Sequence, residues 1–341
     1  MEYFANFLFY CDSKGVLHPD FQQGGTVTGR LSCRDPNLQN LTNPDKYEEQ
    51  TEAALYPVRR SFIPRPGYFF AMIDFQQVEF RLALDYANAN SLIAKVLDGY
   101  DVHTATAEVA NVSRKEAKTV NFLSIYGGGV VKLAQKLYGT KGSKAQLGAI
   151  YKKMFGWRLS DEEQRAWPTV TDELRQFNEP VIRKAYEVQQ SVFRAAPEIK
   201  DFLKSVQRVA ENRGYVRNWF GRRYYCNDKR WAYKAPNHLI QGSAADIIKV
   251  AMNRVDEYLK DKESKMLLSI HDELVIEVKY GEEFVVNEIK AIMEGIWVHR
   301  RLPLLVDVEW SDKNLADKHA WPPENFSHGA KTGDEISKAS N

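Results

Sequence analysis

Cysteine is scarce in this chain of 341 residues, with three occurrences at positions 11, 33 and 226. Thiols this few and this scattered exclude a disulfide scaffold or a cysteine-rich zinc cluster, and they favour a reducing compartment such as the cytoplasm. No apolar run approaches the length that spans a bilayer. The aromatic start is short, has no cationic flank and carries Glu2, unlike a secretory signal. We therefore expect a soluble protein with no membrane partner.

A large excess of one charge is also missing. Lys and Arg number 47 and Asp and Glu 45, a net charge of +2, so a polyanion would have to be recognised by a local patch. The chain has no internal repeat, and its length predicts about two domains. Residues 322–341 are rich in Gly, Ser, Lys and Pro and predict a disordered tail.

The segment from Ser113 to Gly127 has the features of one helix with both ends marked. Ser113 and Glu116 have the spacing of a capping box, and the glycines that begin at Gly127 end the helix. Between the caps, two cations and two aromatic residues recur every fourth position and share a face: Arg114, Lys118, Phe122 and Tyr126. Such a face suits a nucleoside triphosphate. The alternative is a solvated cationic turn followed by two core aromatics.

Two predicted strand ends each carry a carboxylate. Residues 67–74 form an apolar strand that ends on Asp74, and helical periodicity follows from Val78. Residues 266–278 alternate as two strands around a tight turn that contains Asp272. Acids at a turn are usually just solvated, but two acids on separate strand ends are also what a two-metal site needs.

A third stretch, residues 213–234, interleaves seven basic residues with aromatic ones. Basic groups neutralise phosphates and aromatics pack on bases, although a β-hairpin with a charged outer face is the alternative. A long helical region precedes it at 181–212, and a further helix follows Asn237. Residues from about 140 to 180 are mixed and charged, and predict an inserted or peripheral element.

Four motifs in this order resemble the polymerase region of family A DNA polymerases, such as bacterial DNA polymerase I and its phage replicative relatives. They are Thr28–Asn40 for the first motif, Asp74–Arg81 for motif A, Arg114–Gly127 with the spacing Arg-x3-Lys-x3-Phe-x3-Tyr-Gly for motif B, and His271–Glu273 for motif C. Shorter supporting matches are Asp101–His103, Gly214–Arg223 and Asn237–Ile247. The resemblance runs from about Val16 to His319.

The resemblance implies an α+β fold, with an antiparallel palm sheet that carries helices, and mainly helical fingers. We expect palm at 1–85 and 213–321, and fingers at 86–212 with the inserted element at about 140–180. Family members place a thumb, and usually a 3′–5′ exonuclease domain, before the first motif, and only about fifteen residues precede it here. The expectation is therefore the palm-and-fingers subunit of a split polymerase. A piece of a longer polymerase would look the same.

The implied activity is that of a DNA-directed DNA polymerase, which adds deoxynucleotides to a primer 3′ end by phosphoryl transfer with two Mg²⁺ ions. Asp74 and Asp272 are the implied metal ligands and catalytic residues. The Phe75 carbonyl is a further implied ligand and Glu273 a candidate one. Lys118 would contact the triphosphate near the transferred phosphate and protonate the departing pyrophosphate.

The other implied site residues fall into two sets. The nucleotide-binding set is Arg114, Lys118, Phe122, Tyr126, His103, Glu79 and Gln77. The DNA-binding set is Arg30, Asn237, Gln241, Gln39, Asn40 and His271. Glu79 would fill the volume of a ribose 2′ hydroxyl, although an exposed glutamate paired with a cation is the alternative. In this family, Phe rather than Tyr at the position of Phe122 is associated with discrimination against dideoxynucleotides. The resemblance therefore implies that this chain discriminates against them. Structural roles stay open for Gln39, Asn40 and His271.

The implied partners are primer–template DNA, deoxynucleoside triphosphates and a separate thumb and exonuclease subunit. A helicase or processivity factor would dock on the inserted element. The abbreviated, phage-like architecture suggests a phage-encoded protein in the cytoplasm of its bacterial host. One departure from motif A is Gln76, where the family has a small residue. The alternatives are a single-subunit RNA polymerase-like enzyme, a non-catalytic DNA-binding or scaffold subunit, and a self-sufficient lesion-bypass polymerase.

Overall fold

The computed structural model describes residues 7–41, 58–297 and 301–323. The chain divides into two compact units, which we call the sheet unit (1–78 and 241–341) and the helical unit (79–240). The predicted boundaries differ from these, because residues 213–240 pack within the helical unit: the ring of Trp219 stacks on that of Tyr86 at 3.5 Å. The division into palm and fingers stays a prediction. Most of the predicted tail lies outside the described residues.

An antiparallel sheet forms the centre of the sheet unit, with strand order β6-β7-β3-β8-β9. The strands are β3 (Tyr68–Phe75), β6 (Lys265–Ile270), β7 (Glu273–Lys279), β8 (Val306–Ser311) and β9 (His319–Ala320). The strand predicted to end on Asp74 and the hairpin predicted to contain Asp272 are both confirmed. The apolar run of β3 is buried along most of its length, which explains why it shows little alternation.

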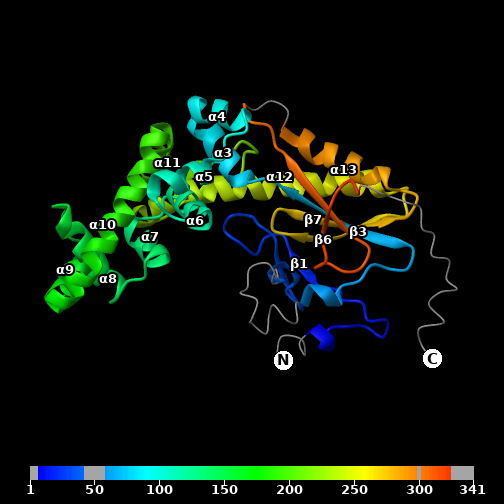
Figure 1. The fold of residues 1–341 in the computed structure, drawn as a ribbon, viewed down its shortest axis with the longest axis horizontal. Helices are drawn as coiled ribbons and strands as arrows, with labels where there is room; N and C mark the ends of the chain where they lie inside the picture. The colour runs from blue at the N-terminus through cyan, green and yellow to red at the C-terminus, as the bar shows by residue number, and fades with distance from the viewer. Residues whose placement is uncertain (1–6, 42–57, 298–300, 324–341) are drawn as a thin grey trace. The chain divides into compact units, whose positions relative to one another are not determined.

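Helices and the N-terminal segment cover the two faces of this sheet. Figure 1 shows α12 (Ala235–Leu259) and α13 (Phe284–Glu294) along one side of the sheet, and the N-terminal segment on the other. Phe70 and Met72 of β3 pack against Leu38 and Val58 of that segment. The segment contains the ribbon of β1 (Asp20–Gln22) with β2 (Ser32–Arg34), and the short 3₁₀ helices η1 (Leu38–Asn40) and η3 (Val58–Ser61). A further 3₁₀ turn, η6 (Gly295–Trp297), follows α13.

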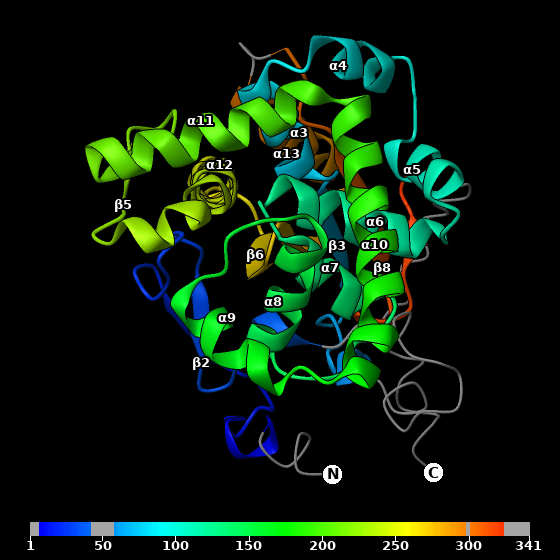
Figure 2. The same cartoon turned by 90° about the vertical axis from the view of Figure 1, so that its left-hand side faces the viewer.

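The helical unit is built around α10, which lies beside α6, α7 and α8 in Figure 2. Its helices are α3 (Val78–Ala87), α4 (Asn90–Leu97), α5 (Val102–Ala110), α6 (Arg114–Ile125), α7 (Val130–Leu137), α8 (Lys144–Met154), α9 (Asp161–Ala166), α10 (Asp172–Ala195) and α11 (Pro197–Arg213). The 3₁₀ helices η4 (Trp167–Thr169) and η5 (Lys229–Lys234) and the ribbon of β4 (Tyr215–Arg217) and β5 (Arg223–Tyr225) complete it. The β-hairpin that was the alternative interpretation of 213–234 is thus present.

Helix α6 has the predicted ends. The Ser113 hydroxyl accepts a hydrogen bond from the Glu116 amide at 3.2 Å, and the Glu116 carboxylate accepts one from the Ser113 amide at 2.7 Å. The helix ends before Gly127, whose φ of +71° favours glycine. At Gly128 an added Cβ would approach the Leu123 carbonyl oxygen to 2.7 Å, so that position also requires glycine. In the described part of the chain, no helix combines the length and the apolar character needed to cross a membrane.

Candidate functional site

One face of the sheet carries a row of acidic side chains. Asp74 on β3 is directly opposite Glu273 on β7 and Asp307 on β8, and residues paired in this way project from the same face. Asp272 lies in the turn before β7, and its carbonyl accepts a hydrogen bond from the Phe75 amide at 3.4 Å. The two predicted carboxylates, Asp74 and Asp272, therefore lie at the same end of the sheet.

These carboxylates repel one another. Asp74 borders a polar cleft of about 690 Å³. Its side chain still reaches solvent, but withdrawal from bulk water by the cleft walls and the charges of Glu273 and Asp272 raise the pKa of Asp74 to about 7. Burial also raises the pKa of Asp272, against the opposing effect of the Arg30 charge. A bound cation would relieve this repulsion.

Carboxylate and carbonyl oxygens are the ligands that Mg²⁺ prefers. Asp74, Asp272 and the carbonyl of Phe75 supply such oxygens at the acidic end of the sheet. Among the residues that the structure describes, no group of three or more His, Cys, Asp or Glu side chains is arranged to hold a metal ion. Mg²⁺ can be held by one or two carboxylates, with water or substrate phosphate supplying its other ligands. That arrangement is usual for Mg²⁺.

Two predicted DNA-binding residues adjoin Asp272. The Arg30 guanidinium lies 3.9 Å from the Asp272 carboxylate, and both side chains are about one-third exposed at 32% and 27%. His271 is exposed at the apex of the hairpin, with a φ of +58° in the left-handed region. Because few residues other than glycine adopt this φ, the backbone of His271 shapes the turn that presents Asp272.

Gln39 and Asn40 lie at the 3₁₀ helix η1. The Gln39 side chain is buried and donates a hydrogen bond to the Ser269 carbonyl at 3.3 Å. It thereby ties the N-terminal segment to β6, which favours the structural role left open for it. Asn40 is exposed.

The predicted stripe of α6 lies on the outer face of that helix. The Lys118 ammonium lies 5.9 Å from the centre of the Phe122 ring, and the rings of Phe122 and Tyr126 lie 5.8 Å apart. Lys118 is exposed and the two aromatic rings are half-buried. The residues that α6 buries are different ones: Ala117, Val120, Asn121, Ser124 and Ile125. The alternative of two core aromatics therefore does not describe this helix.

Arg114 is held at the start of the stripe by Asp101. Its Nε donates to the Asp101 carboxylate at 2.8 Å. Asp101 also caps α5, because it accepts a hydrogen bond from the His103 amide at 2.9 Å. Partial withdrawal from water acts to raise the pKa of Asp101, but the hydrogen bonds from Arg114 and Thr104 hold it well below its usual range. The Arg114 side chain stays 59% exposed.

His103 is buried behind the stripe, with 1% of its surface exposed. Its ring lies 5.9 Å from that of Phe122. The Asn121 amide nitrogen lies 3.0 Å from His103 Nδ1, and the Asn121 oxygen accepts from the Thr106 hydroxyl at 3.1 Å. An amide nitrogen can only donate, so Nδ1 is the acceptor and the neutral ring carries its proton on Nε2. Burial lowers the pKa of His103, which favours this neutral form.

The remaining predicted residues lie on two other helices or next to one of them. Glu79, in the first turn of α3, is buried, so the alternative of an exposed surface glutamate is wrong. Gln77 lies in the turn before α3, with a φ of +48°. Asn237 and Gln241 are four residues apart on α12 and both half-buried, so they share one face of that helix.

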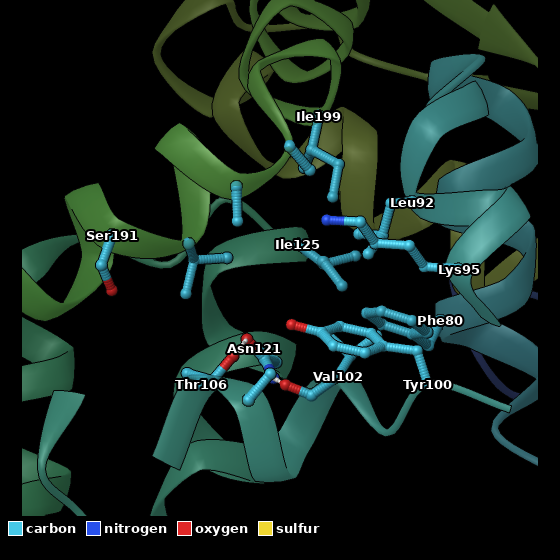
Figure 3. A pocket seen from close by; sticks show the side chains of 14 residues that line it. Phe80, Leu92, Lys95, Tyr100, Val102, Thr106, Asn121, Ile125, Ser191 and Ile199 are labelled. Atoms are coloured by element: carbon cyan, nitrogen blue, oxygen red, sulfur yellow. Dashed lines mark hydrogen bonds between the residues drawn. The ribbon is translucent and has the colours of Figure 1, made fainter. Parts of the chain in front are cut away.

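The buried side of α6 borders a small pocket of about 110 Å³. Figure 3 shows Asn121 and Ile125 of α6 facing it, with Lys95 of α4 and Tyr100 on another side and Ile199 of α11 beyond. Most of its lining is apolar. The position of α6 therefore depends on the packing of α4, α5 and α11 behind it.

Comparison with known proteins decides the family. The sequence profile of DNA polymerase family A matches residues 2–157 and 174–316. The chain belongs to this family. Family A relatives include DNA polymerase I of Caldicellulosiruptor bescii, 31% identical over 87% of this chain and 32% of that protein. They also include the thermostable DNA polymerase I of Thermus aquaticus, 29% identical over 86% of this chain and 31% of that protein. The chain thus spans about a third of the length of these relatives.

A solved family A structure has the same fold. The POL domain of Pol1 from M. smegmatis, in complex with DNA primer-template and dNTP, matches with a TM-score of 0.72 and 27% identity, over 93% of this chain and 51% of that chain. The predicted fold class of antiparallel sheet and helices is confirmed. The profile leaves out residues 158–173, which lie within the predicted inserted element.

Three residues of the site were not predicted from the sequence. Asp307 lies on β8 in the alternating run Val-Asp-Val-Glu, a pattern that marks a strand but not its neighbour in the sheet. Asn121 lies between Val120 and Phe122 on α6, where its role depends on α5. Lys318 binds two carboxylates of the acidic face from a loop 45 residues further along the chain than Glu273.

Proposed function

We propose that this chain is the catalytic part of a template-directed DNA polymerase that adds deoxynucleotides to a primer 3′ end. One observation carries the proposal: in a family A chain, Asp74 and Asp272 lie at the same end of the sheet, and the charge of Asp272 contributes to raising the pKa of Asp74. These two carboxylates and the Phe75 carbonyl would hold two Mg²⁺ ions. Bound there, the ions would activate the primer hydroxyl and neutralise charge on the transferred phosphate.

The outer face of α6 would bind the incoming triphosphate. Arg114, oriented by Asp101, and Lys118 would neutralise the phosphates, and Lys118 would give a proton to the departing pyrophosphate. His103 would add a hydrogen bond from Nε2 as a neutral donor, the tautomer that Asn121 favours. This last role requires the buried ring to become accessible when nucleotide binds.

Sugar and base recognition would use the aromatic half of the same stripe. Phe122 would pack on the sugar and base, and Tyr126 would close the stack near the templating position. Glu79, with Gln77 two positions before it, would occupy the space of a ribose 2′ hydroxyl and so favour deoxynucleotides. The burial of Glu79 supports a fixed wall rather than a mobile surface group.

Arg30, Asn237 and Gln241 would contact the duplex near its primer end, and Asn40 and His271 are further candidate contacts. Minor-groove acceptors look alike in all base pairs, so such donors sense pairing geometry without reading sequence. The complex of the M. smegmatis relative with primer-template and dNTP supports these two partners. We further propose that a separate thumb and exonuclease subunit completes a phage-type enzyme, and that the inserted element binds a helicase or processivity factor.

Primer extension with Mg²⁺ and deoxynucleotides tests the proposal. We expect extension by the purified chain, alone or mixed with its thumb-bearing subunit. Asp74→Asn and Asp272→Asn should abolish it, and the exposed helix-terminal control Asp161→Asn should not. Equal extension by all variants would refute the assigned carboxylates. Absence of extension by the folded wild-type chain under both conditions would favour the non-catalytic alternative.

A further inference from the structure

The acidic face holds more carboxylates than a two-ligand metal site uses. Asp74 has an acid directly opposite it on each neighbouring strand, Glu273 on one side and Asp307 on the other. Glu309 lies two residues beyond Asp307 on the same face of β8. Like charges directly opposite one another destabilise a sheet, so this row needs donors to balance it.

Each acid that flanks Asp74 has such a donor. The Lys318 ammonium bonds to Glu273 at 3.1 Å and to Glu309 at 2.7 Å, and it is only 16% exposed. On the other flank, the Gln76 side-chain amide donates to the Asp307 carboxylate. The second oxygen of Glu273 is enclosed by protein and has no hydrogen-bond partner. One oxygen of Glu273 thus faces a cation that belongs to the protein, and the other is shielded from solvent, so both compete poorly for an ion from solution.

From this arrangement we infer that Lys318 is a positioning residue that keeps Glu273 out of metal coordination. Gln76 does the same for Asp307. The two donors leave Asp74 and Asp272 as the carboxylates open to metal. The inference rests on the proposed function, because it assumes that these two residues are the ligands.

The length of the Gln76 side chain allows its amide to reach Asp307 on β8 from the end of β3.

Mn²⁺ binding to the metal-free protein, followed by electron paramagnetic resonance of the free ion, tests the inference without any turnover. In Lys318→Met, the released Glu273 should become a ligand and tighten Mn²⁺ binding about tenfold or more, because cation affinity rises with the number of charged ligands. Adding Glu273→Gln to this variant should return the affinity to that of the wild type. Gln76→Ser should act in the same direction through Asp307.

The variant Lys290→Met is the control for the loss of one positive charge near the cleft. Lys290 lines the same cleft and pairs with Glu294 at 4.0 Å, so this variant removes one positive charge without freeing an acid of the row. The inference requires a clearly larger effect of Lys318→Met than of Lys290→Met. Equal effects, or undiminished tight binding in the Lys318→Met/Glu273→Gln double variant, would overturn it.

A single substitution in the wild-type background provides a test if Lys318→Met does not fold. Glu273→Gln alone should leave Mn²⁺ affinity close to that of the wild type, and a loss as large as that caused by Asp74→Asn would show that Glu273 is already a ligand. Failure of the proposed function looks different. In that case Asp74→Asn and Asp272→Asn would bind Mn²⁺ as the wild type does, whatever the result at Lys318.

Discussion

Asn121→Ala tests how the buried side of α6 supports its nucleotide-binding face. Asn121 has no exposed surface, and its side chain contacts three groups of α5. These are His103 Nδ1 at 3.0 Å, the Thr106 hydroxyl at 3.1 Å and the Val102 carbonyl at 3.4 Å. The substitution removes all three hydrogen bonds and leaves the Nδ1 acceptor buried without a donor.

The expected cost follows from these contacts. Each buried polar group left unsatisfied costs about 1–3 kcal/mol, and the Thr106 hydroxyl can rotate toward another acceptor, so we expect a loss of about 2–4 kcal/mol. For a unit of this size, each kcal/mol lowers the melting temperature by about 2–4 °C. Asn121→Ala should therefore lower the melting temperature of the helical unit by about 4–16 °C.

The assay is thermal unfolding by circular dichroism with a double-mutant cycle. Thr106→Val alone should be destabilising, and in the Asn121→Ala background it should cost less, because its partner is already gone. Additive effects would refute the network, as would a shift in melting below about 2 °C, which is the change expected from less than 1 kcal/mol. Nitrogen NMR should also show the His103 proton on Nε2 in the wild type and lose that preference in Asn121→Ala.

Three further predictions concern α6 and its neighbours. Ser113→Ala removes the capping box and should cost about 1 kcal/mol in thermal unfolding, whereas Ser113→Thr should cost less; equal losses would contradict the cap. Asp101→Asn should destabilise the protein at neutral pH. Since folding depresses the pKa of Asp101, the difference from wild type should be complete above about pH 4 and shrink as the pH falls below it; a difference that grows in acid would contradict the Arg114 pairing. Phe122→Tyr should increase dideoxynucleotide incorporation about tenfold, the worth of one hydrogen bond of about 1.4 kcal/mol to the nucleotide, measured by chain termination in primer extension; an unchanged ratio would contradict the assigned contact.

Local patterns predicted much of the fold. The capping box at Ser113, the glycine after Tyr126 and the four-residue spacing of the stripe depend on residues within one or two turns, so the sequence alone defines α6 and its outer face. The strand that carries Asp74 and the hairpin that carries Asp272 could be predicted for the same reason. Motif order then predicted the family. The burial of Glu79 could not be predicted, because it depends on which other elements pack against α3.

The sequence by itself therefore determined helix α6, the strand of Asp74, the hairpin of Asp272 and the family. Only the tertiary structure decided which acids lie opposite Asp74, which donors hold them, and that Asn121 fixes the ring of His103. These relations join residues from 15 to more than 200 positions apart. Strand order and helix packing set such distances, and both follow from burial of apolar surface over the whole chain rather than from local sequence.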